Sequence, residues 1–283
     1  MKFVAKRDQK LSAALSDVGV SYGAACRLLR KKDVKVNGAR VSSDCRICAG
    51  DEVEAFLPLP AAIVYEDENL LIADKKAGIE CAGEGSLEAM LGERCPTVRA
   101  CHRLDRNTQG LVIYAKNEDA EREVCEGLRT REIRKRYECV AVSARDLGEG
   151  KAEAFLFKDA KKGRVFVTDR PERGAKPIAT TWKQRERIDE RLVRLEVEIL
   201  TGRTHQIRAH FAHLGFPVLG DEKYGNFAVN KIYRKTAQCL VATEIEFGAC
   251  EGALAGVRGK IFRSSRSVWR GGFEGAASDF EKN

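Results

Sequence analysis

The order of strand-like and helix-like segments limits most strongly the folds that this chain can adopt. Apolar or alternating runs that are typical of strands occur at 63–75, 111–116, 137–142, 178–182, 192–200 and 239–247. Helical patterns interrupt this series, but without the regular strand–helix–strand alternation that builds a parallel sheet. We therefore predict an α+β fold with a mixed, mostly antiparallel sheet over residues 62–270.

A polar turn at 102–110 places one carboxylate, Asp105, between Arg103 and Arg106. The turn ends in Gly110 and leads into a strand expected to be buried, so Asp105 lies at the mouth of a rigid element. Two nearby cations favour the ionised form of a carboxylate, which would make Asp105 available as a nucleophile rather than as an acid. The alternative is a solvated aspartate in a surface ion pair, and the turn alone favours that alternative.

Residues 201–217 contain a self-contained helix signal, with Thr204 as the expected N-cap and Gly215 just after the last turn. The residues expected to face the core are Ile207, Phe211 and Leu214. His205 and Arg208 fall on another side of the helix. A guanidinium held near a helix N-terminus can bind a carboxylate or a phosphate bidentately, which makes Arg208 a candidate site residue.

Metal binding is the least favoured reading of the histidine cluster His205, His210 and His213, because no carboxylate accompanies it. We expect His210 and His213 to be hydrogen-bonded structural residues. The CxxC motif formed by Cys45 and Cys48 lacks a second pair at zinc-site spacing, so a structural role is expected there as well. With no glycine-rich phosphate loop either, we predict neither a metal nor a cofactor.

Residues 1–58 are predicted to form a small, basic module. The first fifty residues hold eleven Lys and Arg against four Asp and Glu, a net charge of +7 out of +8 for the chain. Helices are expected at 10–17 and from an N-cap at Ser21 to about 32, followed by a hairpin at 34–41 around Asn37-Gly38 and a closing strand at 50–56. Such a charge surplus points to a nucleic acid, with a merely solvated basic surface as the alternative.

The remaining segments bear on organisation and location. Residues 57–60 contain two prolines and are expected to link two domains, while 271–283 are expected to form a disordered tail. The ten cysteines form no disulfide framework, and most, such as Cys125 and Cys139, are expected to be small buried residues. Because there is also no N-terminal leader and no apolar run long enough to span a bilayer, we expect a cytoplasmic monomer without membrane contact.

Four motifs carry a family resemblance: "YEDENLLIADKKAG", "HRLDRNTQGLVIYAK", "RKRYECVAV" and "TGRTHQIRAHFAHLGFPVLGDEKYG". In this order they resemble the RluA-type pseudouridine synthases, which isomerise uridine in RNA. In the N-terminal module, "VKVNGARV" and "GDEVEAF" resemble the alpha-L RNA-binding domain. The family pattern usually has proline where Lys76 stands and serine where Gln109 stands, and these departures affect local loop geometry and substrate choice.

The resemblance implies roles for individual residues. Asp105 matches the catalytic nucleophile, Tyr137 the tyrosine that packs on the uracil and assists proton transfer, and Arg208 the arginine that pairs with the catalytic carboxylate. Arg103 matches an arginine that enters the RNA stack after the target base has flipped out. We also expect RNA contacts from basic or polar side chains in both domains, namely Arg27, Arg30, Lys31, Lys35, Arg40, Arg203 and His205.

The resemblance therefore predicts an RNA pseudouridine synthase. Structured RNA is the expected partner, with ribosomal large-subunit RNA ahead of transfer RNA. Two alternatives from other classes stay open: a catalytically silent RNA-binding or ribosome-assembly protein, and, last, a metal-dependent nuclease built on the 205–213 histidines.

Overall fold

The structure is a computed structural model that describes residues 1–20, 22–56, 60–159 and 163–268. The chain divides into two compact units, Met1–Pro60 and Ala61–Asn283. Three expectations fall wholly or partly outside the described residues: the Ser21 cap, the 57–60 linker and the 271–283 tail. Within the described ranges, no helix combines the length and the apolar character needed to cross a membrane.

The first unit is a four-stranded sheet packed against two helices. The sheet order is β1 (Lys2–Val4), β6 (Glu52–Ala55), β3 (Val34–Val36) and β4 (Ala39–Val41), with helices α1 (Leu11–Asp17) and α2 (Tyr22–Arg30) and a small pair β2 (Gln9–Lys10) and β5 (Arg46–Ile47). The turn between β3 and β4 has positive φ at Asn37 and Gly38, as a two-residue hairpin turn requires. Buried aliphatic side chains, such as Leu11, Leu15 and Val34, form its core.

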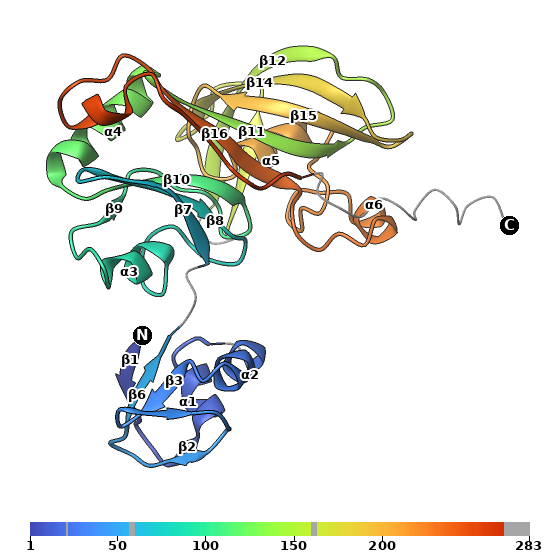
Figure 1. Ribbon diagram of the computed structural model, residues 1–283. Coiled ribbons are helices and arrows are strands. Elements are labelled where there is room, and N and C mark those ends of the chain that lie inside the picture. Colours follow the sequence, from blue (N-terminus) through green and yellow to red (C-terminus); the bar gives the residue numbers. More distant parts are fainter. Residues whose placement is uncertain (21, 57–59, 160–162, 269–283) are drawn as a thin grey trace, which may run out of the picture. The chain divides into compact units, whose positions relative to one another are not determined.

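The second unit is built on one eleven-stranded sheet (Figure 1). Its main path runs β13 (Arg164–Thr168), β12 (Glu149–Asp159), β14 (Lys176–Arg187), β15 (Leu192–Ile199), β11 (Ile133–Val142), β16 (Leu240–Phe247), β10 (Gln109–Ala115), β8 (Leu70–Lys75) and β7 (Ala61–Glu66). The short strands β9 (Arg99–Ala100) and β17 (Ile261–Arg263) pair with β10 and β16. Among the described pairs only β10 with β16 is parallel, which confirms the mixed, mostly antiparallel sheet.

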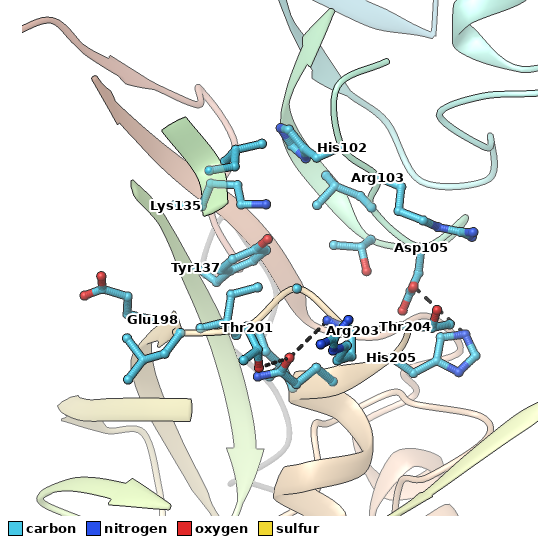
Figure 2. Close-up of a pocket in the computed structure, with 18 of the residues that line it drawn as sticks. His102, Arg103, Asp105, Lys135, Tyr137, Glu198, Thr201, Arg203, Thr204 and His205 are labelled. Atoms are coloured by element: carbon cyan, nitrogen blue, oxygen red, sulfur yellow. Dashed lines mark hydrogen bonds and ion pairs between the residues drawn. The ribbon is translucent and has the colours of Figure 1, made fainter. Parts of the chain in front are cut away.

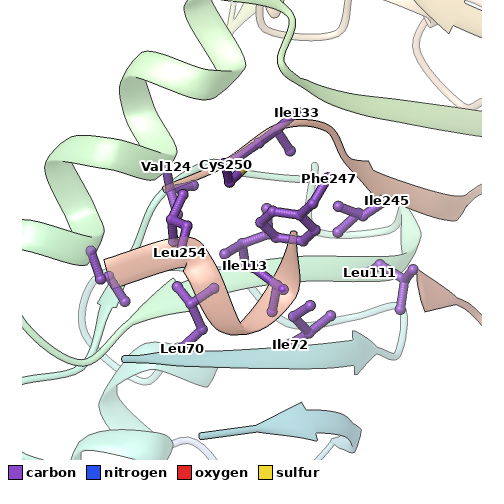
Figure 3. Packing of buried hydrophobic residues seen from close by; sticks show 13 residues of the cluster. Leu70, Ile72, Leu111, Ile113, Val124, Ile133, Ile245, Phe247, Cys250 and Leu254 are labelled. Carbon is purple, nitrogen blue, oxygen red and sulfur yellow. The ribbon is translucent and has the colours of Figure 1, made fainter. Parts of the chain in front are cut away.

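One face of the sheet is covered by helix α4 (Glu118–Thr130) and a 3₁₀ helix at Gly252–Val257 (Figure 3). The side chain of Asn117 accepts a hydrogen bond from the amide of Ala120 and so caps the N-terminus of α4. The residues packed beneath these helices come from β8, β10 and β16, and include Leu70, Ile72, Leu111, Ile113, Ile245 and Phe247. This apolar layer holds the central strands rigid on that face. The remaining helices are α3 (Leu87–Gly92), α5 (Gln206–His213) and α6 (Phe227–Ile232).

Gly110 anchors the 102–110 turn to the centre of the sheet. Its φ is +112°, and it pairs with Ala242 at the parallel β10–β16 contact. A Cβ atom at this position would lie 2.1 Å from the carbonyl oxygen of Ala242, so only glycine allows this approach. The turn that carries Asp105 is therefore fixed at one end to the best-buried part of the sheet.

Several local expectations are wrong. Helix α5 begins after His205, whose φ is 53°, and Thr204 is not its N-cap. The reason is that the side chain of Gln206 accepts hydrogen bonds from the Thr201 hydroxyl at 2.8 Å and the Arg203 amide at 3.1 Å, which folds the preceding loop inward. Strand β11 begins at Ile133 rather than at 137. Cys125 is exposed, although Cys139 is buried as expected.

Candidate active site

A pocket of about 380 Å³ opens in the second unit, and Asp105, Tyr137 and Arg208 all line it. Figure 2 shows Asp105 and Tyr137 on facing sides of this pocket. The three side chains come from separate elements: the turn before β10, the strand β11 and the helix α5. Asp105 and Arg208 are about a hundred residues apart in the chain, with Tyr137 between them. The structure thus brings these three candidates to one place.

Arg208 joins two carboxylates at the base of the pocket. Its Nη1 donates to Asp105 Oδ2 at 2.8 Å, while Nε and Nη2 donate to both oxygens of Asp221 at 2.6 and 3.0 Å. Burial alone would lower the pKa of Arg208, but Asp221 and then Asp105 outweigh it and raise that pKa. Conversely, burial would raise the pKa of Asp221, and Arg208 lowers it instead. The guanidinium is therefore a fixed, permanently charged donor beside Asp105.

The two arginines that flank Asp105 in the sequence have other partners, whereas Arg208, the partner that the family resemblance implied, contacts Asp105. Arg103 extends toward Glu80, with a 3.8 Å ion pair, and Arg106 donates from Nε to the Gly78 carbonyl at 3.1 Å. The ion pair with Asp105 is formed instead by Arg208, which lies about a hundred residues further along the chain. Neighbours in the sequence of a tight turn diverge in space, so adjacency did not predict the contact.

Lys75 supports the 102–110 turn through hydrogen bonds. Its side chain is fully buried, and its ammonium donates to the carbonyl oxygens of Lys76, Ile79, Asp105 and Arg106 at 2.9–3.3 Å. Burial lowers the pKa of Lys75, while nearby thiol and carboxylate groups oppose that effect. A charge at the end of an apolar strand was the only sequence signal for it. Lys76, where the family pattern usually has proline, is exposed at this turn and leaves the ammonium's contacts intact.

We expect Lys75→Met to destabilise the second unit and to slow any reaction that uses Asp105. Four backbone carbonyls would lose a common donor, but those of Asp105 and Arg106 would keep the amide N–H donors of Thr108 and Gly78. Each unsatisfied buried group costs about 1–3 kcal/mol, so a loss of about 2–4 kcal/mol is expected from the other two carbonyls. Urea unfolding of the full chain measures this, with the exposed Lys151→Met as the control. An unchanged unfolding free energy would show that the ammonium does not support the turn.

His205 and Tyr224 close the other side of Asp105. His205 Nε2 lies 3.9 Å from Asp105 Oδ1, and its Nδ1 shares a 2.8 Å hydrogen bond with the Tyr224 hydroxyl, which also accepts from the Val165 amide at 2.9 Å. Burial lowers the pKa of His205, and the charge of Asp105 opposes this. Tyr224 and Asp221 both lie at the end of the last of the four family motifs, but the sequence singled out neither of them as a site residue.

Tyr137 lies on β11 with only 4% of its surface exposed, and it lines the pocket. Burial, and then the charge of Asp105, raise the pKa of Tyr137. Its phenol is therefore protonated at neutral pH, so it offers an aromatic face and an O–H donor but not a base.

The other predicted contact residues are distributed over both units. Arg103 and Arg203 are exposed around the pocket, and Arg27, Arg30 and Lys31 are exposed in the first unit. Lys35 and Arg40 lie near acidic side chains, at 3.5 Å from Glu54 and 3.8 Å from Asp33, and both pack over the Phe56 ring. Those two are therefore partly neutralised within the protein.

The histidines of α5 have protein partners. His210 Nδ1 lies 3.0 Å from the Thr180 hydroxyl, and His213 Nε2 lies 2.7 Å from Asp169 Oδ1. Hydrogen-bonded structural roles are thus confirmed for both. In the part of the chain that the structure describes, no group of three or more His, Cys, Asp or Glu residues is arranged to hold a metal ion.

Comparison with known proteins identifies the class of this fold and pocket. The family model described as RNA pseudouridylate synthase matches residues 69–213. The solved structure of human RNA Pseudouridylate Synthase Domain Containing 1 superposes with a TM-score of 0.57 at 24% identity, covering 68% of this chain and 81% of the human one, which shows a shared fold.

Two curated relatives narrow the class. Ribosomal large subunit pseudouridine synthase C of Vibrio cholerae is 30% identical over 228 residues, covering 71% of each chain. Ribosomal large subunit pseudouridine synthase D of Yersinia pestis is 32% identical over 242 residues, covering 77% of this chain and 73% of its own. The chain therefore belongs to the RluA-type RNA pseudouridine synthase family, whose members are isomerases that convert uridine to pseudouridine in RNA.

Proposed function

We propose that this chain isomerises specific uridines of ribosomal large-subunit RNA, with Asp105 as the nucleophile. The observation that carries the proposal is the Asp105–Arg208 ion pair in the same pocket as Tyr137. The reaction breaks the glycosidic C–N bond, turns the base, and rejoins it to the sugar through carbon. All atoms are conserved and no electrons are gained or lost, so the step needs no oxidant or reductant.

Each residue has a task that its geometry fits. Arg208 holds the Asp105 carboxylate in one orientation, and Asp221 holds Arg208, so the nucleophile is positioned before the substrate arrives. Tyr137 offers a ring on which a flipped uracil can stack and a protonated hydroxyl that can donate a hydrogen bond. Arg103, exposed beside the pocket, is placed to contact the RNA from which the base has left.

The names of the curated relatives support ribosomal large-subunit RNA as the substrate, ahead of transfer RNA. The test is to incubate the purified full chain with unmodified transcripts of both RNAs and to map pseudouridine by carbodiimide labelling and primer extension. We expect one or a few sites in the large-subunit transcript. Modification of transfer RNA alone would overturn the substrate, and no pseudouridine in either would favour a silent RNA-binding protein.

We further propose that residues 1–58 form an alpha-L type RNA-binding domain that raises affinity for the substrate. Its exposed cations Arg27, Arg30 and Lys31 support this. Changing all three to Gln should weaken RNA binding at least about tenfold and reduce the salt dependence, since each phosphate contact adds about 0.7–0.9 to the slope of log K against log salt. The control removes three exposed lysines of the second unit, Lys151, Lys158 and Lys183. Equal binding by the two triple variants would contradict the proposal.

A further inference from the structure

Lys135 is a charged pocket residue to which the proposed reaction gives no task. It lies on β11 two positions before Tyr137, and both side chains line the pocket (Figure 2). In a strand, residues two apart share a face, so the ammonium and the aromatic ring point into the same space. In the figure Asp105 stands on the opposite side of that space.

The neighbours of Lys135 on β11 are neutralised, whereas Lys135 is not. Arg134 lies 3.6 Å from Glu246, and Arg136 pairs with Glu244 and Glu246 on β16. Among the residues that the structure describes, no carboxylate lies within ion-pair distance of Lys135. Pairing of the two arginines fixes them on the sheet, so Lys135 is the cation of this strand that remains available inside the pocket.

The groups around Lys135 leave its charge uncompensated. Burial lowers its pKa to about 8. The neighbouring His102 accepts the Ile113 N–H through Nε2 at 3.1 Å, and burial, followed by the charge of Lys135, lowers its pKa well below the ordinary value, so its ring is neutral. Glu198 on β15 lines the pocket too, but Figure 2 shows its carboxylate directed away from Lys135.

We propose that Lys135 binds a phosphodiester oxygen of the RNA inside the pocket, at the phosphate next to the flipped uridine. A desolvated cation without a partner is costly to the folded protein and is compensated when an anion arrives. Lysine is a compact charge that suits phosphate. Uracil fits this position less well, because its edge carries an N–H donor between its carbonyl oxygens. Arg131 and Arg203, which line the same pocket, add to the positive field.

This inference rests on the proposed function, so its test starts from an RNA fragment that the wild-type chain modifies. Single phosphodiesters on either side of the target uridine are replaced by uncharged methylphosphonates, and affinity and single-turnover rate are measured for wild type and Lys135→Met. Lys183→Met, which removes an exposed lysine of β14, is the matched control. Failure of the wild-type chain to modify the fragment would count against the proposed function and not against Lys135 alone.

We expect Lys135→Met to weaken binding of the unmodified fragment about ten- to a hundredfold, as for loss of one charged hydrogen bond. A methylphosphonate at one linkage should weaken binding by the wild-type chain to a similar extent. On RNA with that methylphosphonate, Lys135→Met should bind as tightly as wild type. Lys135→Arg should recover part of the affinity. If the losses of affinity from Lys135→Met and from a methylphosphonate multiply at every linkage, Lys135 contacts something other than phosphate. Unchanged binding by Lys135→Met would overturn the proposal.

A thermal-unfolding measurement separates binding from a structural role. Because the folded protein holds Lys135 at a lowered pKa, its charge opposes folding below about pH 8, and stability should rise as the pH increases from about 8 toward the ordinary lysine pKa of 10.5. Lys135→Met should be at least as stable as wild type at pH 7 and should lack that rise. A clear loss of stability at pH 7 would mean that the residue serves the fold.

Discussion

Substitution of Arg208 by methionine is expected to lower kcat by about 10²- to 10³-fold, the usual cost of removing one preorganised charged donor from an active site. The guanidinium would no longer hold Asp105 at 2.8 Å, and the carboxylate could rotate away from the substrate. Single-turnover assays on an RNA fragment that the wild-type chain modifies measure the effect directly. Wild-type kcat in this variant would show that the ion pair is not used.

Arg208→Met also leaves Asp221 buried without its partner, which costs about 3–5 kcal/mol and complicates the comparison. Arg208→Lys keeps the charge but cannot contact both carboxylates in the same geometry, so it should fold better and still lose most of kcat.

The Arg208–Asp221 pair also predicts a pH dependence of stability. Because Arg208 lowers the pKa of Asp221, the contribution of this ion pair to the free energy of unfolding is complete at neutral pH and is lost as the pH falls below about 4. Arg208→Met should lack this pH-dependent contribution.

Asp105→Asn is expected to have the largest effect on the reaction, a loss of about 10⁴-fold or more, because removal of a catalytic nucleophile typically costs that much. The amide keeps the size of the side chain and still accepts a hydrogen bond from Arg208. We therefore expect thermal stability and RNA affinity close to wild type. Asp119→Asn, at an exposed position on α4, is the matched control and should retain full activity.

Local patterns predicted the parts of the site that depend on nearby sequence. The turn before β10, the strand β11 and the helix near Arg208 each have a recognisable motif, and the structure places their candidate residues around one pocket. The β3–β4 hairpin was predictable for the same reason, since turn chemistry is local.

Residues that act through distant partners could not be found in this way. Lys75 is recognisable only when the backbone carbonyls of residues 76–79 and 105–106 come together around it, and Asp221 only when α5 brings Arg208 to it. Strands β12 and β13 were also missed. The first half of β12, residues 149–154, consists of Glu, Gly, Lys and Ala, which have low strand propensity. Thr204 does not cap the helix because the side chain of Gln206 accepts hydrogen bonds from Thr201 and Arg203 in the same loop.

The most direct test of the Asp105 nucleophile is a pseudouridine map of total RNA from cells that carry either the wild-type chain or Asp105→Asn as the sole copy. Carbodiimide labelling and primer extension report every modified position at once. The account predicts that one or a few sites, in large-subunit ribosomal RNA, disappear in the Asp105→Asn cells. If purified wild-type and Asp105→Asn chains instead form pseudouridine at the same site with equal rates, Asp105 is not the nucleophile.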